Sequence, residues 1–431
     1  MRDIRKSRLF VLAALVACAA AACSSGGGGG STPSATGPVT LSWWHNATSQ
    51  PLEGLWQATA NQYHSAHSNV SFKIDPIQNE SLMTKIPVAL QGNQPPDIFQ
   101  QWGGGWEASQ IPSGKLMDLT SASASWIKEL GPVAQGWAVN GKQYGIPFDQ
   151  HVVGFWYRKD VFARAGITSP PTTMDQLNTD IAQLKAHGIQ AVGIGSKDRW
   201  PDAFYWDYFA VRECSISTLQ QASKSINLSD PCWVKAGNDL KAFLATQPFQ
   251  SGFLGTPAQQ GAGSSAGMLA NGKVAMELQG DWEPATMAPL TTDKSLPSKM
   301  GWFPFPSVAG GQGNQQAALG GGDGFSCLTT AGPSCADFLK YIDSTPVQQK
   351  MATTGNGLPV NPAAASSITD PNLKQVLQYT HDAPYIQLYF DIAFPTNVGQ
   401  ALDNTVADYF GGKGSPQSMV HDITNAQNGD K

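Results

Sequence analysis

Tryptophan occurs beside polar side chains at several places in this sequence, and these clusters are where the chain could bind a small polar molecule. The chain has 13 tryptophans, and the clusters read WWH, QQWGGGW, RWPDAFYWDY and QGDWEP. An indole face suits an apolar C–H surface, whereas carboxylate, amide and imidazole groups form hydrogen bonds with hydroxyls. A pyranose ring offers both kinds of surface, so the clusters contain the side chains that a sugar site would need.

The first cluster, within LSWWHN, ends the first expected strand. Because side chains alternate between the two faces of a strand, Trp43 shares a face with Val39 and Leu41 and is expected in the core. Trp44 points to the other face. We expect Trp44 and His45 to be exposed at the end of this strand and to bind ligand.

The N-terminal residues are expected to be a leader followed by a tether. Basic residues precede an apolar run over 9–22, which is too short to span a bilayer permanently and indicates an export signal. We predict a lipoprotein signal peptide over 1–22 and a flexible Ser/Gly/Thr/Pro tether over 23–38. Cys23, which leads directly into the tether, is favoured over Cys18 as the lipidated residue; an ordinary secreted protein is the alternative.

The charge balance argues against one class of partner. The formal net charge is −5, and removal of residues 1–22, with their four basic residues and one acidic residue, lowers it to −8. The remaining chain has no run of lysine or arginine. We therefore expect no nucleic-acid partner.

The four remaining cysteines can form two disulfides in an oxidising compartment. Cys214 with Cys232, and Cys327 with Cys335, would each close a short loop, although three connectivities are formally possible. None of the spacings matches a zinc site. We therefore expect two local disulfides, no metal and no cofactor.

Helices and strands alternate in the N-terminal part of the chain. Apolar residues recur at helical spacing over 48–70, a strand pattern follows over 70–74, and 81–91 is again helical. This rhythm is typical of a parallel sheet covered by helices, in which ligands bind beyond the carboxyl ends of the strands. Gln101 and Trp102, which end the expected strand in PPDIFQQW, lie at such a position and are candidate ligand residues.

The same rhythm restarts further along the chain. A capping box of Thr173 and Gln176 begins a helix that stops at Gly188, before the short strand QAVGIG. Between the two halves, a turn marked by glycine and proline indicates an interdomain crossing near 147–150. No internal repeat is visible.

Four motifs stand in a fixed order along the chain: GKQYGIPFD, WYRKDVFARAGI, PPTTMDQL and GKVAMELQGDW. Together they resemble motifs of the extracellular solute-binding proteins of family 1, which are the sugar-binding receptors of ABC importers and include the maltose-binding type. The resemblance covers nearly the whole chain after the leader. It implies an α/β, two-lobed periplasmic-binding-protein-like fold with a hinge and a central ligand cleft.

The resemblance also implies lobe boundaries. The expected N-terminal lobe comprises 39–148 and 307–345, and the expected C-terminal lobe comprises 149–306 and 346–431. By analogy with the family, the second and third crossings would fall near 305–307 and 343–349.

Two pairs of candidate ligand residues follow from this placement of the cleft. Asp281 and Trp282 are the strongest pair, because GDW follows the strand pattern KVAMELQ and has no core spacing of its own. Asp149 and Gln150 lie where the first crossing would enter the cleft.

Four further candidates are Glu80, Asp323, Phe390 and Asp391. Glu80 could bind hydroxyls or favour a helix N-terminus electrostatically. Asp323, within GGGDGF, lies where glycines allow close approach of backbone to ligand. Phe390 and Asp391 are also candidates, although an aromatic stripe on a helix is more often part of the core.

Two other functions would use some of the same residues. Paired carboxylates drawn from Glu80, Asp149, Asp281 and Asp323 would suit a glycoside hydrolase. A peptide or polyamine receptor of the same fold would need a denser set of acidic residues at the cleft. The sequence lacks an H-E-x-x-H helix and a Walker P-loop.

The resemblance favours a receptor over an enzyme. It implies a protein that captures a neutral sugar or short oligosaccharide and delivers it to the permease subunits of an ABC transporter. We expect a monomer that is anchored to the extracytoplasmic face of the cell membrane only through its lipid.

Overall fold

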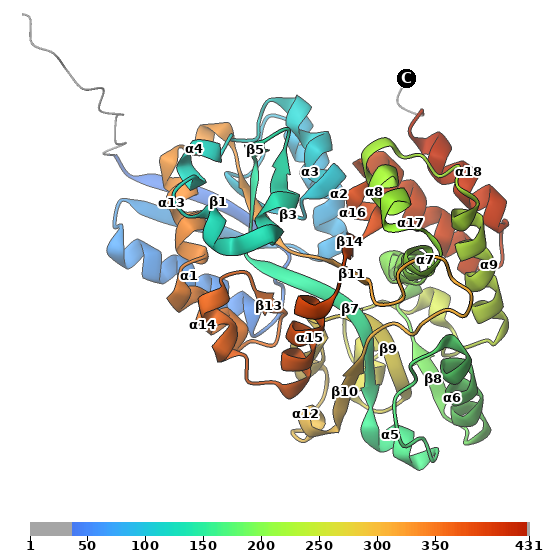
Figure 1. Cartoon of the computed structure of the whole chain (residues 1–431). Coiled ribbons are helices and arrows are strands. Elements are labelled where there is room, and N and C mark those ends of the chain that lie inside the picture. Colours follow the sequence, from blue (N-terminus) through green and yellow to red (C-terminus); the bar gives the residue numbers. More distant parts are fainter. Residues whose placement is uncertain (1–36, 429–431) are drawn as a thin grey trace, which may run out of the picture. The chain divides into compact units, whose positions relative to one another are not determined.

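The computed structural model describes residues 37–428, which fold into two α/β lobes (Figure 1). The predicted signal peptide, both candidate lipidated cysteines, Cys18 and Cys23, and most of the predicted tether lie outside the described residues. No helix within 37–428 has the length and apolar character required to span a bilayer.

A five-stranded sheet forms the first lobe. In spatial order its strands are β2 (Val70–Pro76), β1 (Val39–His45), β3 (Ile98–Gln101), β12 (Gly324–Cys327) and β6 (Gly145–Pro147). β1 is parallel to β2 and β3, whereas β12 runs antiparallel to β3 and β6. The alternating strand–helix rhythm therefore correctly predicts the parallel part of the sheet. β12, which comes late in the chain, adds an antiparallel strand between β3 and β6.

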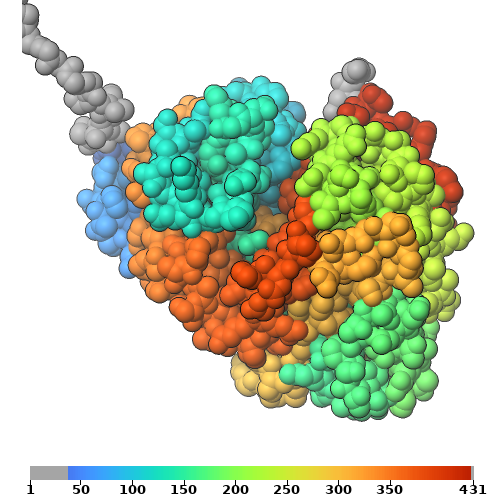
Figure 2. Space-filling model, viewed as in Figure 1, coloured from blue at the N-terminus to red at the C-terminus, as the bar shows by residue number. Residues whose placement is uncertain are grey.

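Helices from both ends of the sequence cover this sheet. They are α1 (Leu52–Ala66), α2 (Asn79–Gln91), α13 (Pro333–Ile342) and α14 (Thr345–Ala352). α13 and α14 contact α1, so that the orange surface lies against the blue one in Figure 2. The first lobe is therefore built from two segments that are distant in sequence.

Aromatic packing fills the core of the first lobe, as predicted for Trp43. This indole is fully buried, with ring centroids 5.1 Å from Phe325, 5.2 Å from Phe338 and 5.8 Å from Trp56. These rings come from β12, α13 and α1, so they connect the sheet to its helices.

The second sheet surrounds one long strand, β7. In spatial order its main strands are β14 (Ile386–Leu388), β11 (Ala318–Gly321), β7 (Asp149–Arg158), β9 (Val274–Gly280) and β8 (Gln190–Gly193). β10 (Met300–Phe303) and β13 (Leu358–Pro359) also pair with β7. Its pairings with several strands make β7 the element that organises the second lobe.

Helices of the second lobe pack around α7 (Trp200–Glu213), every residue of which is buried. Its neighbours include α9 (Pro231–Ala245) and α17 (Thr396–Phe410), and α18 (Pro416–Ala426) packs on both of these. α6 (Met174–Ala186) begins at Thr173, whose hydroxyl accepts a hydrogen bond from the Gln176 backbone N–H. This bond is one half of the predicted capping box; the Gln176 side chain accepts from the Thr172 N–H and hydroxyl, not from the Thr173 N–H.

The remaining elements are short. The helices are α3 (Gly104–Gln110), α4 (Thr120–Ser123), α5 (Lys159–Arg164), α8 (Ile216–Ser225), α10 (Ser265–Ala270), α11 (Glu283–Met287), α12 (Leu296–Lys299), α15 (Pro371–Asp382) and α16 (Phe390–Ala393). A small ribbon consists of β4 (Ala138–Val139) and β5 (Lys142–Gln143). Short 3-10 helices are η1 (Ile111–Ser113), η2 (Ile127–Trp137), η3 (Ser196–Asp198), η4 (Phe253–Gly255), η5 (Ala288–Leu290), η6 (Thr329–Ala331) and η7 (Pro362–Ser367).

The chain passes between the two sheets three times; the first two passages are adjacent, and the third lies between β12 and β13. It leaves the first sheet after β6 and enters β7 at Asp149; it returns between the end of β11 at Gly321 and the start of β12 at Gly324. The second passage thus lies later in the chain than the predicted 305–307. The lobe boundaries as a whole stay a prediction.

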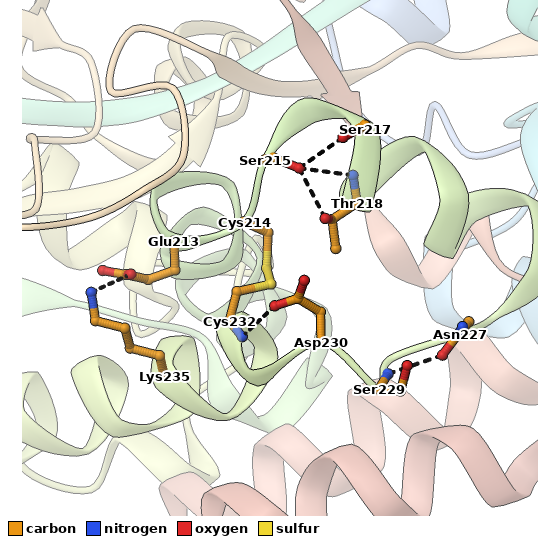
Figure 3. The surroundings of a disulfide bond; sticks show 10 residues. All are labelled: Glu213, Cys214, Ser215, Ser217, Thr218, Asn227, Ser229, Asp230, Cys232 and Lys235. Carbon is orange, nitrogen blue, oxygen red and sulfur yellow. Dashed lines mark hydrogen bonds and ion pairs between the residues drawn. A yellow bond between two sulfur atoms is a disulfide. The ribbon is translucent and has the colours of Figure 1, made fainter.

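Two disulfides have the predicted pairing. Cys214, after α7, bonds to Cys232 in the first turn of α9, and Asp230 caps that turn (Figure 3). Cys327 of β12 bonds to Cys335 of α13. Each bond joins two neighbouring elements of one lobe.

Candidate functional site

A cavity of about 530 Å³ is lined by residues of both lobes. This volume is within the range of small-molecule sites. Its aromatic lining consists of Trp102, Trp200, Phe204, Trp282 and Tyr389. Amide side chains in the lining are those of Asn46, Gln50, Gln78, Asn79, Gln259, Gln260 and Asn356. The ionisable side chains in the lining are those of His151, Asp323 and Asp391, and no described lining residue is a lysine or arginine.

Strand pairing places His151 at the floor of the cavity. In β7, His151 lies opposite Gly321 of β11, and β9 pairs antiparallel with the other side of β7. The loop after β11 therefore brings Asp323 to the imidazole, and the turn after β9 brings Asp281 and Trp282. These residues meet only because three strands that are far apart in sequence are neighbours in one sheet.

Three carboxylates surround the His151 ring. Its Nδ1 is 2.6 Å from Asp281 Oδ1, and its Nε2 is 3.1 Å from Asp149 Oδ2 and 3.8 Å from Asp323 Oδ2. The side chains of His151, Asp149 and Asp281 are almost completely buried, whereas Asp323 reaches the cavity. The ligand atoms of Asp149, His151 and Asp323 all lie within 4.8 Å of one another, so this cluster could hold a metal ion.

Burial and charge oppose each other in this cluster. Burial by itself would lower the pKa of His151, but attraction to Asp149 and Asp281 raises the pKa well above its ordinary value. Burial raises the pKa of Asp149 to about 7, although the neighbouring imidazole lowers it. The cluster therefore shares protons between an imidazole and carboxyl groups in a site shielded from water.

Aromatic rings form one wall of the cavity above His151. The Trp282 ring stands edge-on to the imidazole, with centroids 4.8 Å apart, and lies 6.1 Å from Trp200. Phe204 lies 6.4 Å from Trp282 and 5.2 Å from Tyr389. The indole of Trp282 is only partly buried, so its face is available to a ligand.

Asp391 belongs to a second group of acidic residues at the cavity. Burial raises its pKa to about 7. Burial and the nearby Asp391 also raise the pKa of Asp207 well above its usual range, and Asp207 accepts a hydrogen bond from the Phe390 backbone N–H at 3.1 Å. Asp391 can therefore act as either a donor or an acceptor near neutral pH.

Several polar atoms around the cavity have no hydrogen-bond partner among the described residues. They include the Tyr389 hydroxyl, the Trp282 indole nitrogen, His151 Nε2 and Asp149 Oδ2. Buried polar groups are normally paired, so unpaired ones at a cavity indicate that a ligand or water pairs them. Aromatic faces beside unpaired donors and acceptors can bind a solute with both apolar and hydroxyl surfaces.

Comparison with known families decides the class of the protein. Residues 46–341, more than half of the chain, match the family model described as bacterial extracellular solute-binding protein. The chain belongs to this family.

Relatives of this solute-binding protein include one that is named for its solute. The diacetylchitobiose binding protein of Streptomyces coelicolor is 25% identical over 76% of this chain and 75% of its own length. A putative binding protein of Brucella abortus is 31% identical, but the match covers only 26% of this chain and 27% of that protein.

Solved structures share the fold. A protein from a study of xylan utilization by the thermophilic bacterium Caldanaerobius polysaccharolyticus has a TM-score of 0.81, with 24% identity over 90% of this chain and 99% of that chain. A chitin oligosaccharide binding protein has a TM-score of 0.79, with 22% identity over 91% of this chain and 98% of that chain. The two-lobed α/β fold predicted from the sequence is thus confirmed.

Four of the predicted ligand residues line the cavity of this solute-binding protein: Trp102, Trp282, Asp323 and Asp391. The cavity brings together residues that are widely separated in the sequence. Whether each contacts the solute stays a prediction.

The end of β1 differs from the expectation. His45 is fully buried on the same face as Trp43, and burial lowers its pKa to about 4. The expected exposure of His45 is wrong because β1 continues through this residue and its alternation carries the imidazole inward. Trp44 is partly buried beneath Lys85, whose Nζ is 4.5 Å from the ring centroid, and Trp44 is not part of the cavity lining.

Five other candidates lie behind the lining or beside it. Asp149 and Asp281 are buried against His151. Gln101 is buried, and its amide nitrogen donates to Gln110 at 3.0 Å. Glu80 accepts a hydrogen bond from the Trp200 indole. Gln150 is half-buried in β7.

Phe390 is packed within the second lobe. Its ring is fully buried, with centroids 5.3 Å from Trp233 and 5.4 Å from Phe394. A core role agrees with the more common behaviour of aromatic residues on helices.

The sequence interpretation missed several lining residues. His151 stands two positions after Asp149 in an apolar run, and nothing in the sequence marks it. Trp200 and Phe204 belong to the noted cluster RWPDAFYWDY, whose start could have been assigned to the end of strand QAVGIG. Tyr389 directly precedes the predicted pair Phe390 and Asp391.

Proposed function

We propose that this solute-binding protein captures a neutral sugar or short oligosaccharide in its cleft and delivers it to an ABC transporter permease. The observation that carries the proposal is the composition of the cavity lining. Indoles of Trp102, Trp200 and Trp282 provide flat apolar faces, and amide groups surround them without a single lysine or arginine among the described lining residues.

The absence of basic side chains from the described lining favours uncharged solutes over anionic ones. Anionic solutes are usually held by arginine, lysine or backbone N–H groups at a helix N-terminus. A relative in Brucella abortus is named for sn-glycerol-3-phosphate, a phosphorylated solute. Asp323 and Asp391 on the lining would repel a phosphate or a uronate, so we favour an uncharged solute.

Relatives support the choice of a sugar. The relative in Streptomyces coelicolor is named for diacetylchitobiose, and a solved structure of similar fold is a complex with raffinose. Tryptophan faces and neutral amides suit the C–H faces and hydroxyls of such molecules.

A solute with a protonated amine is the second candidate, because the cavity is acidic. Two aspartates lie on the lining, Asp323 and Asp391, and two more, Asp149 and Asp281, lie behind His151. Asp149 and Asp281 lie behind the imidazole and not on the cavity lining. Asp391 has a pKa of about 7, so it is ionised only in part near neutral pH. The negative charge that faces the solute is therefore smaller than four aspartates would give. We therefore favour the neutral sugar.

A thermal-shift screen of neutral, amino, uronic and phosphorylated sugars tests the proposal. A solute at about 100 times its dissociation constant stabilises the folded protein by roughly 2.7 kcal/mol. Shifts with neutral saccharides are expected. Shifts confined to polyamines or peptides would contradict the proposal, and release of new reducing ends from an oligosaccharide would favour the glycoside hydrolase.

Membrane attachment is a separate part of the proposal. We propose that Cys23, or else Cys18, carries the lipid that holds the protein on the extracytoplasmic face of the cell membrane as a monomer. Replacement of both cysteines with serine is expected to move the protein from the membrane fraction to the soluble fraction or to block its processing. Unchanged membrane attachment of the double variant would contradict lipidation.

A further inference from the structure

We propose that Asp149, His151 and Asp323 form a binding site for one divalent transition-metal ion, with Zn²⁺ as the best match, on the floor of the cleft. Nothing in the family assignment requires such a site. The inference also does not depend on which solute the cleft binds.

The spacing of the three ligand atoms fits one metal ion. His151 Nε2 is 3.1 Å from Asp149 Oδ2 and 3.8 Å from Asp323 Oδ2, and all three atoms lie within 4.8 Å of one another. Two ligands of a tetrahedral zinc ion, each about 2.1 Å from the metal, are about 3.4 Å apart. The observed distances lie on both sides of this value, so small side-chain rotations would complete the site.

Asp281 orients the imidazole for this role. Its Oδ1 lies 2.6 Å from His151 Nδ1, which fixes the Nδ1–H in this hydrogen bond when the ring is neutral. The lone pair of Nε2 then points toward Asp149 and Asp323. A carboxylate that holds the opposite nitrogen of a histidine is the common arrangement behind metal-binding histidines.

The two buried ligand atoms lack hydrogen bonds. His151 Nε2 and Asp149 Oδ2 are 3.1 Å apart, and when the ring is neutral and Asp281 holds its Nδ1–H, both atoms are acceptors that face each other without a donor. Both side chains are at least 97% buried. Buried polar atoms without partners require an explanation, and an ion between them would supply one.

The local charge also favours a cation. Among the ion pairs of residues 37–428, Asp149, Asp281 and Asp323 have no partner other than His151. Even a protonated imidazole would leave an excess of negative charge in a buried site, which is costly. A divalent ion that displaces the imidazole proton would bring this cluster closer to neutrality.

The backbone holds the ligands in place. The Asp323 N–H donates to Asp149 Oδ1 at 2.6 Å, and the Asp323 carbonyl accepts from the Phe148 N–H at 2.9 Å. Gly357 approaches the imidazole so closely that an added Cβ would lie 2.4 Å from His151 Cε1. The two adjacent passages between the sheets and the residue before β13 thus hold the three ligand residues close together before an ion binds.

The donor set selects among metals. One imidazole and two carboxylates suit Zn²⁺, whereas Mg²⁺ and Ca²⁺ prefer oxygen ligands alone. His151 and Asp323 also line the cavity, so a fourth ligand position would face the cleft. Water would fill this position in the absence of a solute.

Titration calorimetry with Zn²⁺ alone tests the site. The full chain is used with Cys18 and Cys23 replaced by serine, so that no thiol outside the two disulfides competes for the metal, and after treatment with a chelator. We expect one ion per chain, and a rise in melting temperature with Zn²⁺ but not with equimolar Mg²⁺. Asp323→Asn and Asp281→Asn should each weaken zinc binding by about 10- to 100-fold.

The exposed His421, which also lies beside an aspartate, provides the matched control. His421→Gln should leave zinc binding unchanged. The proposal is overturned if no zinc binds, or if zinc binding is lost in His421→Gln and retained in Asp323→Asn and His151→Gln. Because no sugar is present in the titration, its failure would leave the proposed sugar function untouched.

Discussion

The indole nitrogen of Trp200 donates a hydrogen bond of 3.0 Å to the carboxylate of Glu80. Glu80 belongs to α2 of the first lobe, and Trp200 begins α7 of the second lobe. Trp200 lines the cavity, whereas the second oxygen of Glu80 is buried without a hydrogen-bond partner. This bond joins the two lobes beside the cavity.

Loss of this bond should weaken solute binding. Glu80→Ala removes the acceptor and leaves the Trp200 indole free to rotate, which should cost about 1 kcal/mol, or roughly fivefold in affinity. Glu80→Gln keeps an acceptor oxygen and is the matched control. Titration calorimetry with the bound sugar measures both, and equal losses in the two variants would contradict the assigned role of the hydrogen bond.

Trp282 should contribute more than any single hydrogen bond. Trp282→Ala removes a partly exposed indole from the cavity lining and should weaken sugar binding by roughly 2 kcal/mol or more, the scale of a buried aromatic anchor. The melting temperature without solute should change little. Trp44→Ala is the comparison, because Trp44 lies outside the cavity lining. An equal loss in Trp44→Ala would support the assignment of Trp44 from the sequence.

Trp43 should affect stability but not the solute site. The indole is fully buried between β12, α13 and α1, so Trp43→Ala should reduce the free energy of unfolding by about 3 to 5 kcal/mol. Chemical denaturation measures this change. A loss below 1 kcal/mol would mean that the side chain is not the core residue that its contacts indicate.

The sequence predicts correctly which tryptophan of β1 lies in the core, but it predicts only some of the residues that line the cavity. Strict alternation in β1 assigns Trp43 to the core, and the same rule, carried on for two more residues, places His45 there too. The sequence pattern does not show where the strand ends. His45 is wrongly expected to be exposed because the strand is expected to end before it.

Long-range strand pairing explains why the floor of the cavity was harder to predict. Asp281 was correctly assigned to the turn after a strand, but its carboxylate lies against His151 and not on the cavity lining. This contact depends on the antiparallel pairing of β7 with β9, which are more than a hundred residues apart. No local pattern in the sequence encodes such a pairing.

Buried acidic residues should make stability depend on pH. Glu277 in β9 is almost completely buried, and burial raises its pKa to about 8. The pKa of Glu277 is therefore higher in the folded protein than its ordinary value of 4.5. Its contribution to stability is fully present below pH 4.5, where the carboxyl is protonated in both states, and is lost as the pH rises toward 8.

A neutral isostere should remove this dependence on pH. Glu277→Gln should be more stable than the parent by at least about 1 kcal/mol at pH 8 and should lose this advantage near pH 4.5. Urea unfolding at both pH values measures the difference. Glu129→Gln, at an exposed position, should show no such pattern. A Glu277→Gln variant that is less stable at pH 8 would show that the carboxylate is satisfied in its ionised form.

The most direct test of the account is titration calorimetry of the full chain with neutral saccharides of one to four rings. A disaccharide has about 23 heavy atoms, and about 0.3 kcal/mol per atom gives an affinity of roughly ten micromolar. We predict that at least one neutral saccharide binds at this affinity or more tightly, with one solute per chain, and that Trp282→Ala weakens it. Binding of an anionic sugar, or of amines alone, with no neutral saccharide bound at millimolar concentration would contradict the account.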